Sequence, residues 1–337
     1  QFGFARALYE GFSMSFLTQI NHHSYELMHT LIARYLTPKG MSTKQLRTPC
    51  ARPSDAHILF EYFWIERGSQ KPHTPANFIL TPSIRTHIAS IARAVVSGRN
   101  PVLLQGPTST GKTSMVQYLA QCTGHKFIRI NNHEHTDVQE YLGTYVSDAA
   151  GRLVFKEGAL VDAVRNGYWV LLDELNLAPS EVLEALNRLL DNNRELFIPE
   201  TQQTVRAHPH FMLFATQNPP GLYGGRKALS RAFRNRFVEI HVDDFPDEEL
   251  QYILEKRCII PPSYSKILVA IMKDLQRNRA FSQVFAGRNA FITLRDLFRW
   301  AERRPGSHLE LAIEGYCLLV ERLRKDEDRE LVKKVIE

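Results

Sequence analysis

A glycine-rich loop between an apolar run and a helical pattern is the stretch of this sequence best suited to chemistry. Residues 102–104 are apolar and indicate a short buried strand, and helical spacing begins at Ser114. Between them stands the spacing Gly-x4-Gly-Lys-Thr, from Gly106 to Thr113. After a strand and before a helix, this spacing predicts a phosphate-binding loop, because backbone N–H groups and the helix N-terminus both attract phosphate oxygens.

The residue types in this loop indicate individual roles. Lys112 is expected to reach the β- and γ-phosphates of ATP, and the Thr113 hydroxyl is expected to bind Mg²⁺. A plain glycine-rich turn is the alternative, and the flanking strand and helix patterns count against it. The residues expected to hold ATP or ADP are Gly106, Pro107, Thr108, Ser109, Thr110, Gly111, Lys112, Thr113 and Ser114.

Two carboxylates follow a second apolar run further along the chain. Residues 168–172 indicate a buried strand, and Asp173 and Glu174 come directly after it. We expect Asp173 to hold Mg²⁺ through water, opposite Thr113, and Glu174 to polarise the attacking water as a general base. Two solvated carboxylates at a strand end are the alternative, which the phosphate-binding loop upstream disfavours.

Two further polar residues are candidates for sensing the γ-phosphate. Asn218 follows the apolar run 211–215 and is expected to orient the attacking water, although a turn-forming Asn before proline is the alternative. Arg295 stands at the start of a predicted helix and is expected to reach the phosphates of its own unit. A surface helix arginine is the alternative there.

Three arginines precede the last predicted strand. Guanidinium suits bidentate contact with a γ-phosphate, so one of them is expected to act in a neighbouring site and to offset charge in the transition state. Arg236 is the first candidate for this arginine finger, Arg234 the second and Arg231 the third. A solvated helix face would account for the same residues.

The surrounding elements are those of an α/β domain. Strands alternate with helices from residue 78 onward, which predicts a parallel, doubly wound sheet. The expected strands are 101–105, 127–130, 168–172, 211–215 and 237–241, and the expected helices are 82–97, 112–121, 138–142 and 180–192. Two segments that alternate around turns, 143–158 and 195–208, predict hairpins that project as contact elements.

Helical patterns occupy both ends of the chain and resemble each other. Residues 4–36 indicate two helices, and the chain is helical again after Pro246. Glu10 matches Glu314 at an offset of 304 (314 − 10), and neighbouring positions match at the same offset. We interpret this as a repeat, so that the chain begins at the end of one unit and finishes at the same point of the next. It also begins without Met, and we expect it to be a piece of a longer protein.

Composition argues against several other classes of protein. The net charge of +6 is spread along the chain, so direct sequence-specific nucleic-acid binding is not expected. No apolar run reaches the roughly 18 residues of a membrane span. Widely spaced cysteines indicate reduced thiols of an intracellular protein, with neither a disulfide framework nor a zinc site; they are Cys50, Cys122, Cys258 and Cys317. Four of the histidines could suggest a metal site, but no cysteine or carboxylate spacing supports one; they are His133, His135, His208 and His210.

These motifs resemble the AAA+ superfamily, in the helix-2-insert branch that holds MoxR-type ATPases and dynein-related proteins. The strings that carry the resemblance are residues 129–137, 172–178, 215–219, 223–227 and 231–237. It implies an AAA+ P-loop NTPase fold, with helix-2 and pre-sensor-1 hairpin inserts and a helical lid. It also implies that Asn131 or Asn132 restrains Glu174. The implied domains are the terminal lid helices of a preceding unit (1–40), a linker (41–75), the large α/β nucleotide-binding domain (76–245) and the small helical lid (246–337).

Within that branch, the same strings are similar to those of giant nuclear ATPases with six AAA+ units in one chain. The resemblance implies an ATP-hydrolysing motor unit of a single-chain hexameric ring, with ATP, ADP and Mg²⁺ as ligands. Its implied partners are neighbouring units of the same chain, the pre-60S ribosomal particle and the assembly factors that it removes. Its implied location is the nucleolus and nucleoplasm.

Three alternative functions stay open from sequence. A regulatory nucleotide-binding module with negligible turnover would keep the loop but fail to hydrolyse ATP. A MoxR-type chaperone subunit would form homohexamers, although the repeat at offset 304 argues against a free subunit. A small-molecule P-loop kinase would lack the arrangement of Asn218, Arg236 and Arg295.

Overall fold

The computed structural model describes residues 3–20, 22–36, 45, 48–98, 100–219, 228–281, 292–321, 323 and 326–336. The chain divides into two compact units. The first comprises residues 1–75, 84–107 and 111–243, and the second comprises residues 76–83, 108–110 and 244–337.

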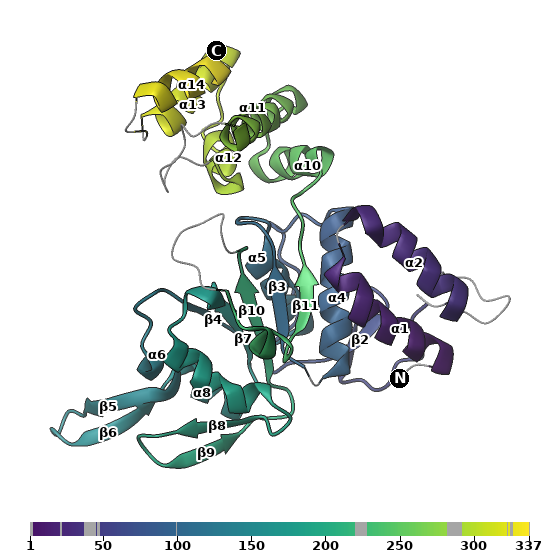
Figure 1. Cartoon of the computed structure of the whole chain (residues 1–337), viewed down its shortest axis with the longest axis vertical. Helices are drawn as coiled ribbons and strands as arrows, with labels where there is room; N and C mark the ends of the chain where they lie inside the picture. The colour runs from purple at the N-terminus through teal and green to yellow at the C-terminus, as the bar shows by residue number, and fades with distance from the viewer. Residues whose placement is uncertain are drawn as a thin grey trace. The chain divides into compact units, whose positions relative to one another are not determined.

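A five-stranded parallel sheet forms the centre of the first unit (Figure 1). Its strands, in the order in which they lie side by side, are β11 (Val238–His241), β3 (Val102–Gln105), β10 (Met212–Gln217), β7 (Trp169–Asp173) and β4 (Phe127–Asn131). Every residue of β7 and β10 is buried, so both faces of the sheet are covered at its centre. The predicted parallel α/β sheet is confirmed, with strand boundaries within two residues of those expected.

Helices follow these strands as the apolar spacing predicts. Their amphipathic faces supply much of the core, including Leu160 and Val164 of α7 and Val182 and Leu186 of α8. The helices of this domain are α4 (Pro82–Ser97), α5 (Lys112–Thr123), α6 (Val138–Leu142), α7 (Ala159–Asn166), α8 (Ser180–Leu190) and the short α9 (Arg231–Arg234).

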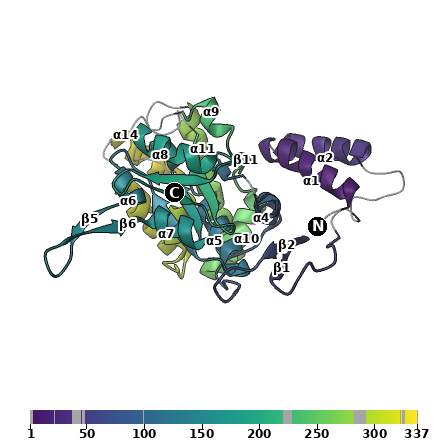
Figure 2. The same cartoon turned by 90° about the horizontal axis from the view of Figure 1, so that it is seen from below.

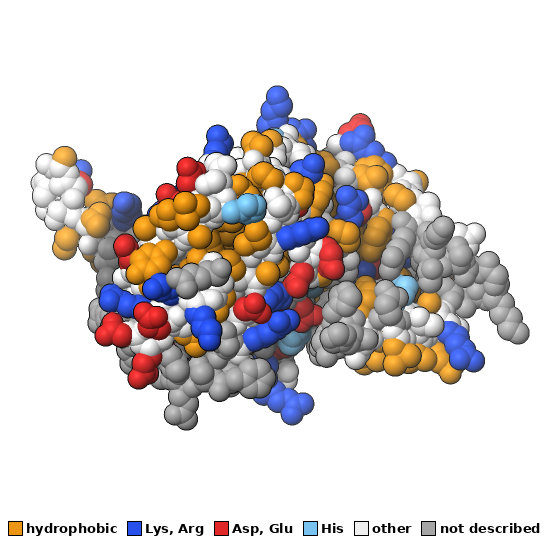
Figure 3. Space-filling view, turned by 90° about the horizontal axis from the view of Figure 1, so that it is seen from above, with side chains coloured by type: hydrophobic (Ala, Val, Ile, Leu, Met, Phe, Trp, Pro, Cys, Tyr) orange, Lys and Arg blue, Asp and Glu red, His pale blue; other side chains and the backbone are white. Residues whose placement is uncertain are grey.

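Both predicted hairpins are present. The first pairs β5 (Gly143–Ser147) with β6 (Leu153–Glu157), and the second pairs β8 (Glu195–Ile198) with β9 (Gln203–Arg206). The β5–β6 hairpin extends away from the body of its unit (Figure 2). It carries exposed hydrophobic side chains, visible on the projecting segment in Figure 3; they are Tyr145, Val146, Leu153 and Val154.

A third hairpin was not expected from sequence. The apolar stretch of residues 58–65 folds into β1 (His57–Phe60) and β2 (Phe63–Glu66), joined by Glu61 and Tyr62. Glu61 has a φ of 53°, a conformation that glycine or asparagine usually supplies. The turn therefore lacks the residues by which a hairpin is normally recognised.

Two helices at the start of the chain pack beside the sheet domain. They are α1 (Phe4–Phe16) and α2 (His22–Leu36), with the short helix η1 (Leu17–Gln19) between them. Glu10 of α1 forms a buried ion pair with Arg93 of α4, with 2.6 Å between Oε2 and Nε. Because removing one member would leave a buried charge unpaired, this contact ties the helix pair to the sheet domain.

The second unit is helical, as predicted after Pro246. Its core includes Leu254, Leu268, Leu297 and Trp300, each fully buried. The Trp300 indole Nε1–H donates a hydrogen bond to the Leu311 carbonyl, at 2.9 Å. Its helices are α10 (Asp247–Cys258), α11 (Pro262–Phe281), α12 (Leu294–Ala301), α13 (His308–Gly315), the π-helical η4 (Tyr316–Val320) and α14 (Asp326–Ile336).

The helix boundaries support the internal repeat. The first helix pair begins at Phe4 and His22, and the last begins at His308 and Asp326. Both starts are separated by 304 residues (308 − 4 and 326 − 22), the offset that relates the sequences. Segments of unrelated origin would have no reason to begin both helices in the same register.

Candidate nucleotide-binding site

The predicted chemistry gathers at the carboxyl ends of the three central strands. β3 ends at Gln105, directly before the glycine-rich loop, and β7 ends at Asp173. Its neighbour β10 ends at Gln217, directly before Asn218. Parallel strands bring their carboxyl ends to one edge of the sheet, where ligands of such folds bind.

Lys112 is held inside the loop. It is the first residue of α5, and its Nζ donates hydrogen bonds to the carbonyls of Gly106 at 2.8 Å and Pro107 at 2.5 Å. The same Nζ lies 3.0 Å from the Asn218 Oδ1. The structure thus brings together the predicted phosphate-binding lysine and the predicted sensor, which are far apart in the sequence.

The Asp173 carboxylate is surrounded by donors. Its Oδ2 accepts a hydrogen bond from the Thr113 hydroxyl at 3.1 Å, as expected for residues that share a cation. Arg129 also contacts Oδ2, through Nε at 2.9 Å and Nη2 at 2.5 Å. The Thr216 hydroxyl donates to the other carboxylate oxygen, Oδ1. The site therefore keeps this largely buried carboxylate compensated by one positive charge and two hydroxyls.

Arg129 and Thr216 are site residues that sequence reasoning did not assign. Arg129 interrupts the apolar run of β4, and Thr216 lies one residue beyond the apolar run predicted for β10. A polar residue within an apolar run, or directly after one, was the available signal. What it contacts depends on strand order, which places both β4 and β10 next to β7.

Glu174 has an unusual backbone conformation. It follows β7 directly, with φ at 51° and ψ at 47°, in the left-handed region. Its backbone N–H donates to the Thr216 hydroxyl at 3.0 Å. Non-glycine residues held in this region concentrate at functional sites, where surrounding contacts enforce the conformation. Here the conformation sets the direction in which the predicted general base leaves the strand.

The candidate arginine fingers lie in different surroundings. Arg236 donates to the Asn187 Oδ1, and its Nε lies 2.8 Å from the Asp191 Oδ1, so residues at the end of α8 hold it. Arg234 lies 3.7 Å from the Glu239 carboxylate, and Arg231 is exposed at the start of α9.

The expected contact of Arg295 with the phosphates stays a prediction. Arg295 is exposed at the second position of α12 in the helical unit. Residues 223–227 lie outside the described residues. The assignment of the arginine finger therefore stays a prediction.

The chain matches three family models in consecutive segments. Residues 101–237 match a model described as the AAA domain of the dynein-related subfamily. Residues 1–39 and 249–337 match two models that are each described as a Midasin AAA lid domain. Residues 101–237 therefore belong to the dynein-related AAA family.

Relatives support this membership. The chain is 65% identical to Midasin of Dictyostelium discoideum over 350 aligned residues that include the whole chain, and 42% identical to Midasin of Giardia intestinalis over 99% of the chain. It spans 6% and 7% of the length of these two proteins. Half of it also aligns, at 31% identity, with 65% of an uncharacterized protein of Staphylococcus aureus. A solved structure from Cytophaga hutchinsonii, named as an ATPase, aligns over 74% of this chain and 78% of its own, with 19% identity and a TM-score of 0.41.

Within the AAA domain, the donor set fits a magnesium nucleotide. Lys112 is the first residue of α5 and lies against the loop carbonyls, so the loop combines a cation with a helix N-terminus. Thr113 and Asp173 offer a hydroxyl and a carboxylate at hydrogen-bond distance from each other, the oxygen ligands that Mg²⁺ prefers. Among the described residues there is no cluster of histidine, cysteine or acidic side chains typical of a protein-bound metal, and no helix long and apolar enough to cross a bilayer.

Asn132 is one of the two residues expected to restrain Glu174, and it contacts the peptide unit that leads into Glu174. Its amide Nδ2 donates to the backbone carbonyl of Asp173 at 2.9 Å, and its own amide oxygen accepts from the Tyr141 hydroxyl. Asn131 pairs in register with Asp173 and is exposed. Asn132 therefore acts on the backbone that precedes Glu174, because the strand register places it beside that carbonyl.

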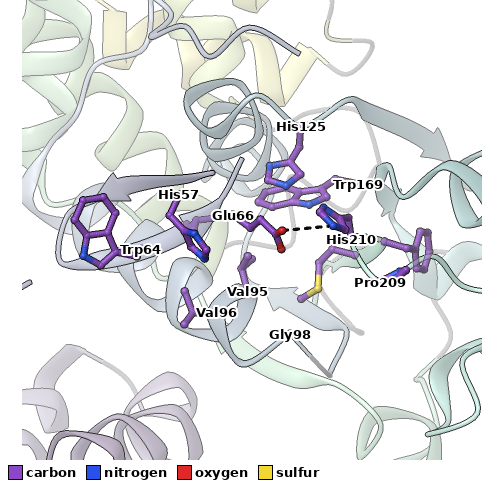
Figure 4. Close-up of a pocket in the computed structure, with 13 residues that line it drawn as sticks. His57, Trp64, Glu66, Val95, Val96, Gly98, His125, Trp169, Pro209 and His210 are labelled. Atoms are coloured by element: carbon purple, nitrogen blue, oxygen red, sulfur yellow. Dashed lines mark ion pairs between the residues drawn. The ribbon is translucent and has the colours of Figure 1, made fainter. Parts of the chain in front are cut away.

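A separate cavity lies at the opposite, amino end of the AAA sheet (Figure 4). It measures about 170 Å³ and is lined in part by Trp169, the first residue of β7, and by His125. These two rings stack with centroids 4.2 Å apart, and His210 lies 3.6 Å from the Glu66 carboxylate. Burial, with a smaller contribution from His210, lowers the pKa of His125 to about 4. His125 is therefore neutral in the folded protein at pH 7.

Acidification should destabilise the fold through this histidine. Because the pKa of His125 is about 4 in the folded chain and 6.5 without the shift, the unfolded state binds the proton more readily between these values. Its contribution to stability is complete above pH 6.5, and about 3 kcal/mol is lost as the pH falls to 4. Urea denaturation at several pH values should show that the free energy of unfolding falls less steeply with decreasing pH in His125→Phe than in the natural sequence. The exposed His135→Gln serves as control, and an unchanged slope in His125→Phe would contradict the assignment.

Proposed function

We propose that this chain is an ATP-hydrolysing motor unit of a single-chain AAA+ ring that remodels pre-60S ribosomal particles and removes their assembly factors. One observation carries the catalytic part of this proposal. The Lys112 Nζ contacts the Asn218 side chain and the Thr113 hydroxyl contacts the Asp173 carboxylate, beside Glu174. Membership of the dynein-related AAA family supports a motor unit. The ribosomal partner and a nuclear location extend the proposal from the sequence resemblance, as do the neighbouring units of the same chain.

Each side chain has a part in the proposed reaction. Lys112 binds the β- and γ-phosphates, and Thr113 with Asp173 holds Mg²⁺, which neutralises phosphate charge when bound. Glu174 takes the proton of the attacking water, which Asn218 orients. Thr216 positions both acidic residues, because its hydroxyl accepts a hydrogen bond from the backbone N–H of Glu174 and donates one to the carboxylate of Asp173. An arginine from this chain, with Arg236 as first candidate, acts in the next unit.

We also propose the domain division expected from sequence, with residues 1–40 as the final lid helices of a preceding unit. The match of 1–39 to a lid model and the helix starts at offset 304 support it. Positions related by the offset of 304 differ in burial. The position in the first helix pair is the more exposed one, as expected if that pair completes the lid of a preceding unit. Val320 is 2% exposed within the lid core, whereas Phe16, its equivalent (320 − 304), is 47% exposed. The first helix pair thus presents a face that the last pair buries.

Two equivalent glycines sharpen this proposal. A Cβ at Gly315 would lie 2.1 Å from the Trp300 ring, whereas a Cβ at Gly11 would meet no atom of the described residues within 4 Å. Glycine in a helix interior costs stability, so its use at Gly11 calls for a reason outside the described residues. A ring equivalent to Trp300, from the lid of the preceding unit, would supply that reason.

Alanine substitutions at these glycines should have opposite effects. Gly315→Ala is expected to lower the free energy of unfolding by about 1–3 kcal/mol, because the new methyl group overlaps the Trp300 ring. Gly11→Ala is expected to leave this chain as stable or up to about 1 kcal/mol more stable, since alanine favours helix. Urea denaturation measures both variants. Equal losses of unfolding free energy in the two variants would contradict the assignment of residues 1–40 to the lid of a preceding unit. The assignment would also be contradicted if Gly11→Ala left the stability of the full-length protein unchanged.

The proposed function is tested by nucleotide binding and turnover together. Equilibrium titration with Mg·ATP should show binding to the chain, and steady-state hydrolysis should be measured in the full-length protein, where the neighbouring arginine is present. We expect the isolated chain to hydrolyse ATP poorly, because the arginine of a neighbouring unit is missing from its site. Binding without any contribution of this unit to turnover would identify a regulatory module instead.

A further inference from the structure

A single side chain connects the turn after β7 to the residue that follows β10. The Asn176 Nδ2 donates a hydrogen bond to the backbone carbonyl of Asn218, at 3.1 Å. The two residues are 42 positions apart in the sequence, and their exposed fractions are 2% and 4%. Because bulk water does not reach a bond buried in this way, a chain without the donor would leave the carbonyl unpaired. The contact therefore joins the ends of two neighbouring strands inside the protein.

Asn176 lies in the same turn as Glu174. The short helix η2 (Leu175–Leu177) follows Glu174 directly, and the Leu177 N–H donates to the Glu174 carbonyl at 2.9 Å. Leu175 is fully buried and anchors this turn in the core. The left-handed backbone of Glu174 begins the turn. The backbone positions of Glu174 and Asn176 are therefore fixed relative to each other.

Asn218 is held from two sides. Its backbone carbonyl accepts the bond from Asn176, and its side-chain Oδ1 lies 3.0 Å from the Lys112 Nζ. The next residue is Pro219, which confines the Asn218 backbone to extended conformations. Lysine is only a donor, so the Asn218 oxygen faces Lys112, and the Nδ2 group remains as the donor of this side chain. The bond from Asn176 thus fixes the backbone from which the Asn218 amide projects.

The other end of the Asn176 amide is unsatisfied. Its Oδ1 is buried and has no hydrogen-bond partner among the residues that the structure describes. The amide therefore satisfies one acceptor and leaves another unpaired, so it adds little stability over a leucine of the same branched shape. Polar groups that break the rules of packing in this way are expected at functional sites.

We propose that Asn176 is a positioning residue that fixes the predicted sensor Asn218 relative to the general base Glu174. The inference rests on the proposed function, in which both side chains act on one attacking water. Two groups that act on one water need a fixed separation, because small misplacements of reacting groups reduce rates steeply. Asn176 supplies this separation, since it shares a turn with Glu174 and donates to the backbone of Asn218. Its effect on hydrolysis is exerted through Asn218.

The test is a double-mutant cycle in ATP hydrolysis by the full-length protein. The turnover that Glu174→Gln removes defines the share of this unit. Asn176→Leu should lower the kcat of that share by about 10–100-fold, with the KM for ATP within about twofold of the natural value. In the Asn218→Ala background, the same substitution should change turnover by less than about twofold, because the side chain that Asn176 positions is already missing.

Two measurements without hydrolysis separate positioning from a loss of structure. In hydrogen–deuterium exchange without nucleotide, Asn176→Leu should raise amide exchange at residues 216–218 by at least about threefold and leave that of β4 unchanged. Its thermal unfolding should stay within about 3 °C of the natural protein, since one unpaired oxygen takes the place of another.

Two further variants complete the design. Asn176→Ala removes the donor without adding volume and should lower kcat in the same way, so it replaces the leucine variant if that protein does not fold. Asn166→Ala is the matched control. The Asn166 Nδ2 also donates to a backbone carbonyl, that of Asp162 at 2.9 Å, but it lies at the end of α7 and is exposed. This variant should hydrolyse ATP like the natural sequence.

The outcomes distinguish the positioning role from the proposed function. If folded Asn176→Leu and Asn176→Ala proteins keep turnover within about twofold of the natural protein, the positioning role is wrong. It is also wrong if the loss is equal in the Asn218→Ala background, or if neither variant folds, because Asn176 is then a structural residue. If Glu174→Gln or Asn218→Ala removes no turnover, the proposed catalytic roles fail, and the positioning role fails with them.

Discussion

Replacement of Glu174 by glutamine is expected to reduce ATP hydrolysis in this unit by about 10²–10⁴-fold, the contribution of a general base. The amide cannot accept a proton from water, yet it has nearly the same shape as the carboxylate. Nucleotide affinity should change little, because the contact of Lys112 with the loop and that of Thr113 with Asp173 do not involve the Glu174 side chain. Single-turnover hydrolysis and Mg·ATP titration separate the two effects.

The matched control for this change is Glu184→Gln. Glu184 is an exposed residue of α8, so the same loss of charge there should leave hydrolysis unaltered. In the full-length protein, Glu174→Gln should also stall release of the remodelled particle while nucleotide remains bound. If turnover stays within about twofold of the natural protein, the unit is a regulatory nucleotide module and not a working catalyst.

Replacement of Lys112 by alanine is expected to abolish nucleotide binding. The Lys112 side chain is 7% exposed, and its Nζ contacts oxygens of Gly106, Pro107 and Asn218. Charge-assisted hydrogen bonds to phosphate are among the stronger ones in proteins, so losing them should weaken Mg·ATP affinity by about 100-fold or more. Equilibrium titration with a fluorescent ATP analogue measures this loss.

Folding must be examined beside binding in this variant. Removal of the lysine leaves the Asn218 Oδ1 and two loop carbonyls without their donor, so thermal unfolding should be followed in parallel. Lys126→Ala, at a partly exposed lysine before β4, serves as control and should bind nucleotide normally. Unchanged affinity in a folded Lys112→Ala protein would rule out a phosphate-binding role for this loop. If affinity is unchanged but the ring becomes unstable, the loop is structural.

The spacing of residues along the chain determined the local elements of this protein. The loop from Gly106 to Thr113 needs only a strand before it and a helix after it, and all three are encoded within some twenty neighbouring residues. The alternation of strands and helices likewise determined a parallel sheet, because its hydrophobic periods are local. Even the repeat of the terminal helices was readable, since both helices begin in the same register at an offset of 304.

Only the tertiary structure decided which polar groups meet. Arg129, Thr216 and Asn132 all contact Asp173, yet they come from two segments that are each about 40 residues away from it along the chain, in or next to β4 and β10. Their contacts follow from strand order and register, which place β4 and β10 on either side of β7. A pattern along one strand does not specify its neighbours. Asn131 or Asn132 was expected to restrain Glu174, and only the structure shows that Asn132 donates to the backbone carbonyl of Asp173, the residue before it.

The turn at Glu61 and the surroundings of Arg236 show the same division. Glu61 adopts a φ of 53° without the residue type that signals such a turn, because the pairing of β1 with β2 imposes it. Arg236 was singled out by residue type alone, and its hold on Asn187 and Asp191 appears only when α8 is packed beside it. Residue type and spacing therefore determined which chemistry this chain can carry, and long-range packing decided how the carboxylates that carry it are aimed.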